Sequence, residues 1–193
     1  MYKRQLLRFL FANGAGAVKA VAVGKDESEE KDYASAFAAL SDEEDVGVMV
    51  CDSAAQSVHL LLKTAAEDAS AARRERIAVI GGSEETVAQM VNRAKAVNSE
   101  RVVLVGPDIA SDDGGTMSAV FAAAAVAGAI ACGADPAVPL NGAELYGIGG
   151  LQSVYSDNDI DLLVQGGVTP LEDVGGVVSP VRGITTRTKT GSA

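Results

Sequence analysis

The chain has 193 residues, 48% hydrophobic and 22% charged, which is enough to bury a core of ordinary size in one domain or in one domain with an appendage. Sixteen Lys and Arg against 26 Asp and Glu give a formal net charge of -10, which repels phosphate backbones and anionic lipid surfaces. Composition therefore predicts a globular protein with neither nucleic acid nor a membrane as partner.

The first twelve residues begin with basic side chains and continue with a short apolar stretch, which Arg8 interrupts. This pattern predicts an amphipathic helix rather than a signal peptide, because the charge breaks the apolar segment that a signal needs. The side chains expected in the core are those of Leu6, Leu7, Leu10 and Phe11.

From residue 18 onward, apolar runs alternate with helical patterns, as is typical of a parallel sheet with crossover helices. The predicted strands are residues 18–23, 46–50, 77–80 and 102–105. The predicted helices are residues 33–40, 53–69, 83–97 and 117–133, the third of them capped by Ser83. The expected fold is α/β, with a mainly parallel sheet flanked by helices.

Residues 117–134 carry no charge over about the length that spans a bilayer. Alanine and glycine dominate this segment, whereas membrane spans are normally driven by Leu, Ile, Val and Phe. We therefore expect a buried helix whose small side chains allow close packing against a sheet or another helix.

Glycine and proline become frequent after Gly133, and the remaining pattern predicts a small β-containing C-terminal appendage. One helix is expected at residues 156–165, where Ser156 and Asp159 form a variant of the capping box. Short strands are expected at residues 168–171, 176–181 and 184–188, the first two joined by a turn at 172–176. These elements divide the chain into a core domain, residues 1–134, and an appendage, residues 135–193.

Two glycine-containing segments invite a phosphate-binding interpretation. Residues 13–17 precede a predicted strand instead of following one, so they lack the context of a dinucleotide-binding loop. Gly81 and Gly82 do follow a strand, but Glu84 and Glu85 in the first helical turn would repel an anion. A structural turn is the expected role of both segments.

Cys51 lies at the carboxyl end of a predicted strand, where α/β enzymes often display a nucleophile. The one histidine, His59, would lie roughly 9–12 Å along the following helix from a nucleophile at its start, too far to act as the base. We expect His59 to be a surface or boundary residue, and a single histidine also disfavours a zinc site. Cys51 and Cys132 lie in apolar surroundings, so no disulfide framework is expected.

Two acidic clusters have the residue types that could bind a hard cation. The segment starting at Asp157 begins like a calcium loop, but Leu162 and Val168 occupy the positions of the turn glycine and the bidentate glutamate. Asp108, Asp112 and Asp113 are expected in a solvated loop. The sequence thus predicts no catalytic residue, no cofactor-binding residue and no metal ligand.

Several segments, in order, resemble the sheath protein of contractile phage and prophage tails. Residues 9–16 and 17–23 resemble the phenylalanine-rich helix, Asn-Gly turn and first strand that open the conserved sheath domain. Residues 94–105 are similar to the helix and strand before the family's alanine-rich helix, and residues 134–142 to the segment after it. Residues 183–188, Gly-Ile-Thr-Thr-Arg-Thr, resemble the motif that leads into the C-terminal sheath domain.

This resemblance implies a structural, non-enzymatic subunit that polymerises around a tail tube and contracts to drive it through the target cell envelope. Its partners would be other sheath subunits and the tail tube protein, in a virion tail or prophage-derived particle assembled in the bacterial host cytoplasm. The chain resembles a central fragment that ends at the start of a truncated C-terminal sheath domain. Because it lacks the family's terminal arms, we expect it to be monomeric.

Two other functions fit the same pattern. A flavodoxin-like domain could bind a small molecule or catalyse a reaction through the loops that follow its strands. A related contractile machine, such as a bacteriocin particle or a type VI secretion sheath, would also need this kind of subunit.

Overall fold

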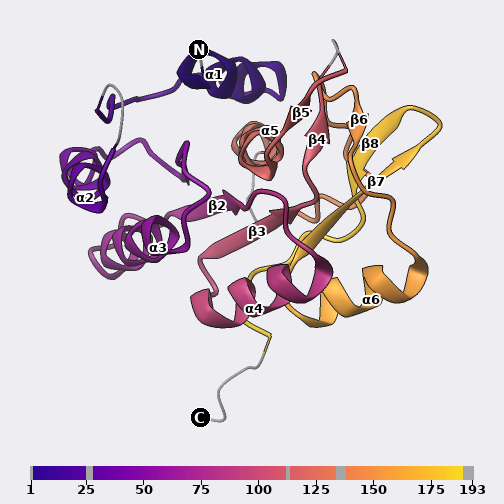
Figure 1. Ribbon diagram of the computed structural model, residues 1–193. Helices are drawn as coiled ribbons and strands as arrows, with labels where there is room; N and C mark the ends of the chain where they lie inside the picture. Colours follow the sequence, from indigo (N-terminus) through magenta and orange to yellow (C-terminus); the bar gives the residue numbers. More distant parts are fainter. Residues whose placement is uncertain (1, 25–27, 112–113, 134–137, 189–193) are drawn as a thin grey trace.

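Six helices and eight strands make up the part of the chain that the computed structural model describes, residues 2–24, 28–111, 114–133 and 138–188 (Figure 1). The helices are α1 (Tyr2–Ala12), α2 (Glu30–Ala39), α3 (Gln56–Ala71), α4 (Val87–Val97), α5 (Ala119–Cys132) and α6 (Asp157–Gln165). The strands are β1 (Val48–Val50), β2 (Ile77–Gly81), β3 (Val102–Gly106), β4 (Ile109–Ala110), β5 (Thr116–Met117), β6 (Gly150–Leu151), β7 (Thr169–Val174) and β8 (Val177–Pro180).

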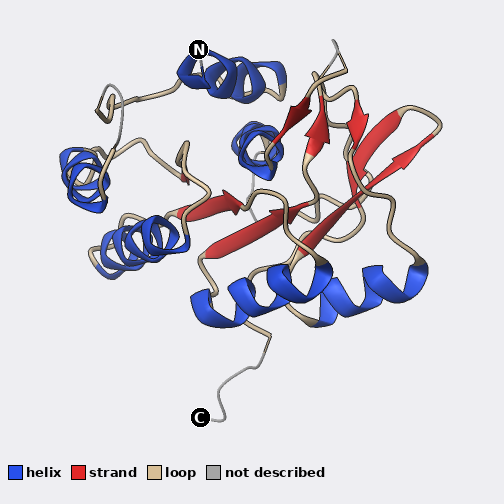
Figure 2. Cartoon of the chain, in the orientation of Figure 1, coloured by secondary structure: helices blue, strands red, loops and turns tan. Residues whose placement is uncertain are grey.

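The main sheet has the strand order β1-β2-β3-β7-β8, and Figure 2 shows it between helices. Its first four strands are parallel, and β8 returns antiparallel to β7. A second, three-stranded antiparallel sheet has the order β5-β4-β6. The α/β class and the mainly parallel sheet are confirmed, and the C-terminal strands β7 and β8 extend that sheet. The division at residue 134 stays a prediction.

Side chains of each central strand alternate between two hydrophobic cores, as the pleat of a strand requires. Val79, Val103 and Val105 point to the first core, which α1 and α5 cover. Ala78, Ile80, Val102 and Leu104 point to the second core, which α2, α3, α4 and α6 cover. Because both faces are buried, β2 and β3 are continuous apolar runs, which made them predictable.

Helix α5 is buried along nearly its whole length, as expected for the alanine-rich segment. It approaches the sheet so closely that a Cβ atom at Gly81 would lie 2.1 Å from the carbonyl oxygen of Ala119. On its other side, a Cβ at Gly128 would lie 2.5 Å from the carbonyl oxygen of Leu10 in α1. None of the described helices is both long and apolar enough to cross a bilayer.

Two predicted strands are absent from the structure. Residues 18–23 run without regular secondary structure, so the predicted first strand is wrong. Residues 184–188 form no strand either, because Thr186 is held by separate bonds. Its amide donates to the carbonyl of Val102 at 2.8 Å, and its hydroxyl both accepts from the amide of Ser99 and donates to its carbonyl, at 2.9 and 3.0 Å.

The structure also differs from the predicted cap of α4 and from the predicted apolar face of α1. Helix α4 is capped by Thr86, which accepts from the amide of Gln89, and not by Ser83. In α1, Phe9 is buried and Phe11 is 52% exposed, so the apolar face is turned from the predicted one. The capping box of Ser156 and Asp159 at α6 is confirmed.

We predict that Gly81→Ala will destabilise the fold by about 3 kcal/mol or more, because the new methyl group meets the rigid backbone of α5. Gly47→Ala is the matched control, since a Cβ there meets nothing within 4 Å. Urea denaturation of both variants measures the free energies of unfolding. Equal values would show that α5 can move away from the sheet without cost.

Candidate functional site

The carboxyl ends of β1, β2 and β3 form the edge where ligands bind in open parallel α/β sheets. The loops at this edge carry Cys51, Glu85 and Asp108, and the first turn of α3 carries His59, all residues that the sequence singles out. Their contacts decide whether this edge holds a reactive site.

The loop after β1 places Cys51 in the second core, with its Sγ 3.7 Å from the carbonyl oxygen of Ser53. Burial raises the pKa of the Cys51 thiol to about 12, so it stays protonated and is a poor nucleophile. Nearby, the Tyr33 hydroxyl donates to Asp52 at 3.0 Å. Burial, and next the Asp52 carboxylate, raise the pKa of Tyr33 to about 12.

His59 is fully buried, which corrects its prediction as a surface or boundary residue. Its Nε2 lies 2.8 Å from the carbonyl oxygen of Ser53, and its Nδ1 lies 3.1 Å from Nη1 of Arg93. Arginine can only donate, so Nδ1 must accept and Nε2 must carry the proton. Burial, together with the charge of Arg93, lowers the pKa of His59 to about 4.

Arg93 joins helix α4 to the loop after β1. Its guanidinium forms an ion pair with Glu85, with Nη2 2.7 Å and Nε 2.8 Å from Oε1, and both side chains are largely buried. It also donates to the carbonyl of Ala54 at 3.0 Å. The sequence gives no sign of this role, because the partners of Arg93 lie up to 39 positions away along the chain.

Cys51 and His59 do not form a catalytic pair, because each contacts the carbonyl of Ser53 instead of the other. The thiol is therefore not paired with the imidazole, which is held between Ser53 and Arg93. This geometry supports a structural role for both residues rather than nucleophilic chemistry.

The loop after β2 is fastened by Asp108, which follows β3. The Asp108 carboxylate accepts from the amide of Glu84 at 2.8 Å and from the amide of Ala119, the first residue of α5, at 2.7 Å. Free amides at such positions can bind phosphate, but here a carboxylate of the protein occupies them. Asp108 thus ties the loop after β2 to α5.

Cation binding finds little support at the described residues, which hold no group of three or more His, Cys, Asp or Glu placed around one point. Asp112 and Asp113 lie outside the described residues, as does Asp135. Asp159 accepts from the amide of Ser156 and so serves the cap of α6.

Arg76, at the start of β2, is buried and binds the end of α2, although its sequence context gives no sign of this. Its guanidinium donates to the carbonyls of Leu40 at 3.0 Å and Ser41 at 3.1 Å, and also to that of Glu43. Cations are favourable at a helix C-terminus, where carbonyls lack partners. Burial lowers the pKa of Arg76 from its usual value.

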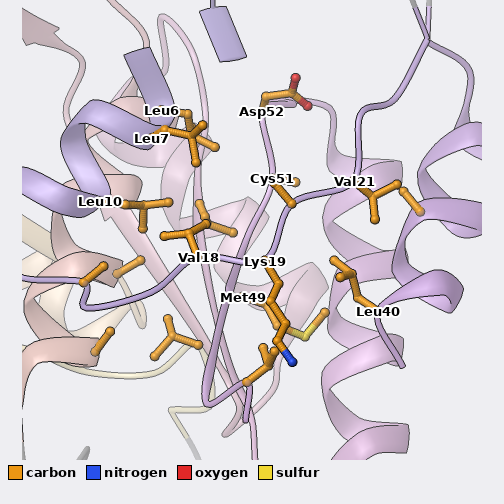
Figure 3. Close-up of a pocket in the computed structure, with 18 of the residues that line it drawn as sticks. Leu6, Leu7, Leu10, Val18, Lys19, Val21, Leu40, Met49, Cys51 and Asp52 are labelled. Atoms are coloured by element: carbon orange, nitrogen blue, oxygen red, sulfur yellow. The ribbon is translucent and has the colours of Figure 1, made fainter. Parts of the chain in front are cut away.

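A cavity of about 720 Å³ lies beside β1, between residues 15–23, α1 and α2 (Figure 3). Its lining is mainly apolar and includes Leu6, Leu7, Leu10, Val18, Phe37 and Met49. Lys19 also lines it and is paired with Glu43. The cavity lies beside residues 18–23, where the sequence predicts a strand that the structure does not contain.

Comparison with known proteins gives a consistent result. Residues 26–186 match the family model of the phage tail sheath protein central domain. No curated protein sequence matches the chain.

Among solved structures, the sheath tail protein of Desulfitobacterium hafniense aligns with 91% of this chain at a TM-score of 0.70 and 18% identity. The sheath tail protein Lin1278 of Listeria innocua aligns with 89% at a TM-score of 0.68 and 14% identity. A chain of the anti-feeding prophage baseplate aligns with 95% of this chain at a TM-score of 0.62 and 15% identity. The chain spans 41%, 37% and 52% of the lengths of these three chains. These likenesses show a shared fold.

We predict that His59 makes the fold sensitive to acid. Its pKa is about 4 in the folded state and about 6.5 when unfolded, so between these values the unfolded chain binds more protons. The free energy of unfolding is therefore unaffected by His59 titration above pH 6.5. It falls as the pH drops from 6.5 toward 4, by about 3 kcal/mol in total.

The variant His59→Gln can still donate to the Ser53 carbonyl but cannot titrate. Urea denaturation between pH 7.5 and 4.5 should therefore show a steeper loss of stability for the natural chain than for the variant. Parallel curves for the two proteins would contradict the assignment.

Proposed function

Because the chain belongs to the phage tail sheath protein family, we propose that it is a structural subunit of a contractile sheath that polymerises around a tail tube. The sheath would then contract and drive the tube through the target cell envelope. The observation that carries this proposal is the match of residues 26–186 to the central domain of sheath proteins. The family is structural, and the described fold agrees with it.

The proposed work of contraction comes from interfaces between subunits. Rigid domains that dock in two arrangements can release free energy when one arrangement replaces the other, and no chemical step is needed. The packing of α5 against the sheet and the cross-links at Asp108, Arg93 and Arg76 support such a role, because they make the domain a rigid body.

The proposed partners are other sheath subunits and the tail tube protein. The proposed location is the tail of a virion or a prophage-derived particle, assembled in the host cytoplasm. The likeness to sheath tail proteins and to a prophage baseplate supports this, together with the family match.

A flavodoxin-like enzyme or binding domain is the alternative. It has the support of the fold class alone, because Cys51 is buried and not paired with His59, and the amide of Glu84 is bound by Asp108. We propose that the chain is not an enzyme.

The decisive experiment locates the protein in particles. Antibodies raised against the purified chain should decorate the outer layer of extended and contracted tails at a regular spacing in electron micrographs. Antibodies against the tube protein serve as the control. Decoration of the capsid, or of no particle at all, would contradict the proposal.

A second expectation concerns assembly of the 193-residue chain by itself. Strand-exchanging arms connect rigid domains into a continuous mesh, and none of the described elements is such an arm. Sedimentation at micromolar concentration should give a monomer. Tubes formed by this chain alone would show that its rigid domain suffices for polymerisation.

A third expectation separates the two candidate functions. Thermal melts with nucleotides, magnesium, calcium or zinc should leave the melting temperature unchanged. A ligand that saturated the native state would instead add several kcal/mol of stability and raise the melting temperature. A reproducible shift at micromolar ligand would support the flavodoxin-like alternative.

A further inference from the structure

We propose that two copies of the chain dock head to tail, with the outward face of α1 on one copy against the outward face of α6 on the other. The two faces consist of Arg4, Arg8 and Phe11 on the first helix, and of Val154, Asp157 and Asp161 at the second. The inference deepens the proposed function and rests on it in one point, that the partner is a second copy of the chain.

Charge is divided unevenly along the chain. Residues 1–24 contain four Lys or Arg and no Asp or Glu, whereas residues 102–181 contain ten Asp or Glu and no Lys or Arg. Because the formal net charge is -10, two copies repel each other in most orientations. They approach most easily where the basic stretch of one copy faces the acidic stretch of the other.

The helices that carry the two faces lie on opposite sides of the main sheet. Phe9 and Leu10 pack α1 on the first core, and Leu163 packs α6 on the second core. Figure 2 shows the two helices on either side of the strands. Within one copy the two faces therefore do not meet, and each is left to a neighbour. A contact between two different patches is heterologous, so it can repeat from copy to copy.

The outward charges have the same spacing on both helices. Arg4 and Arg8 are exposed in α1 and four positions apart, and Asp157 and Asp161 are exposed in α6 and also four positions apart. Residues at this spacing lie on the same side of a helix, one above the other. An antiparallel arrangement of the two helices then places Arg8 opposite Asp157 and Arg4 opposite Asp161. Two pairs of opposite charges form at once.

The same arrangement joins two exposed apolar side chains. Phe11 is 52% exposed near the end of α1, and Val154 is 93% exposed just before α6. Phe11 follows Arg8 by three positions, and Val154 precedes Asp157 by three, so the register that pairs the charges also brings Phe11 to Val154. Burial of these two side chains adds an apolar contribution to the contact.

The contact between two isolated copies is expected to be weak. Exposed charge pairs contribute little and are screened by salt, and both helices are short. The chain should therefore be monomeric at micromolar concentration and associate toward millimolar concentration at low ionic strength. In an assembly that already holds copies side by side, the high effective concentration would make the same contact persist.

Charge reversal tests this proposal on the full chain. Sedimentation equilibrium at low ionic strength, from micromolar to millimolar protein, measures the association constant. The variant Arg4→Glu/Arg8→Glu should lower this constant by about 10-fold, because both pairs become repulsive. The variant Asp157→Lys/Asp161→Lys should lower it by a similar factor, although its smaller net charge would otherwise favour association.

Restored association identifies which faces meet. The variant that carries all four reversals keeps the natural net charge and should regain the natural association constant. An equimolar mixture of the two double variants should regain it as well, because each reversed face then finds an opposite charge. Lys63→Glu/Arg73→Glu is the matched control at α3 and just after it, with the same change of net charge as the α1 variant. It should lower the association constant far less than the α1 variant does.

Three results would overturn the proposal. They are a fourfold variant as weak as the double variants, an α1 variant no weaker than its control, and a natural chain that stays monomeric at millimolar concentration. These measurements need no particle, whereas the proposed function is tested by antibody decoration of tails. The docking proposal and the proposed function can therefore fail separately.

Discussion

The close approach of α5 to the sheet is the constraint on which the other contacts depend. It requires positions without side chains on both sides of the helix, Gly81 in β2 and Gly128 facing α1. Alanine occupies most positions of α5, and these short side chains are compatible with the close packing of the helix on the sheet. Because α1 packs against α5, the N-terminal helix takes its position from the same constraint.

The polar residues at the carboxyl edge of the sheet serve as fasteners. Asp108 joins two loops to α5, and Arg93 joins α4 to the loop after β1 through Glu85 and His59. In α/β enzymes the same edge leaves such groups open to a ligand. Here their hydrogen-bonding capacity is used within the chain, which stiffens the edge and agrees with a structural family.

Much of the fold was predictable because its signals are local. β2 and β3 are short apolar runs, α5 is uncharged, and the cap of α6 lies within four residues. The failures involve distant partners. Residues 18–23 have the composition of a strand, but a strand also needs a paired neighbour, and in the structure they run without regular secondary structure. The environment of His59 depends on Arg93, which lies 34 positions away. Which of Phe9 and Phe11 is buried depends on how α1 is rotated about its axis where it packs on α5, and composition does not specify that rotation.

The bonds of Thr186 have a mechanical consequence. Its amide and hydroxyl attach the chain after β8 to Val102 and Ser99, at the beginning of the central strand β3. A pulling force applied beyond Thr186 therefore loads the middle of the sheet and bypasses the hairpin of β7 and β8. The tension is shared among neighbouring parallel strands, whose hydrogen bonds would have to shear together for the domain to yield.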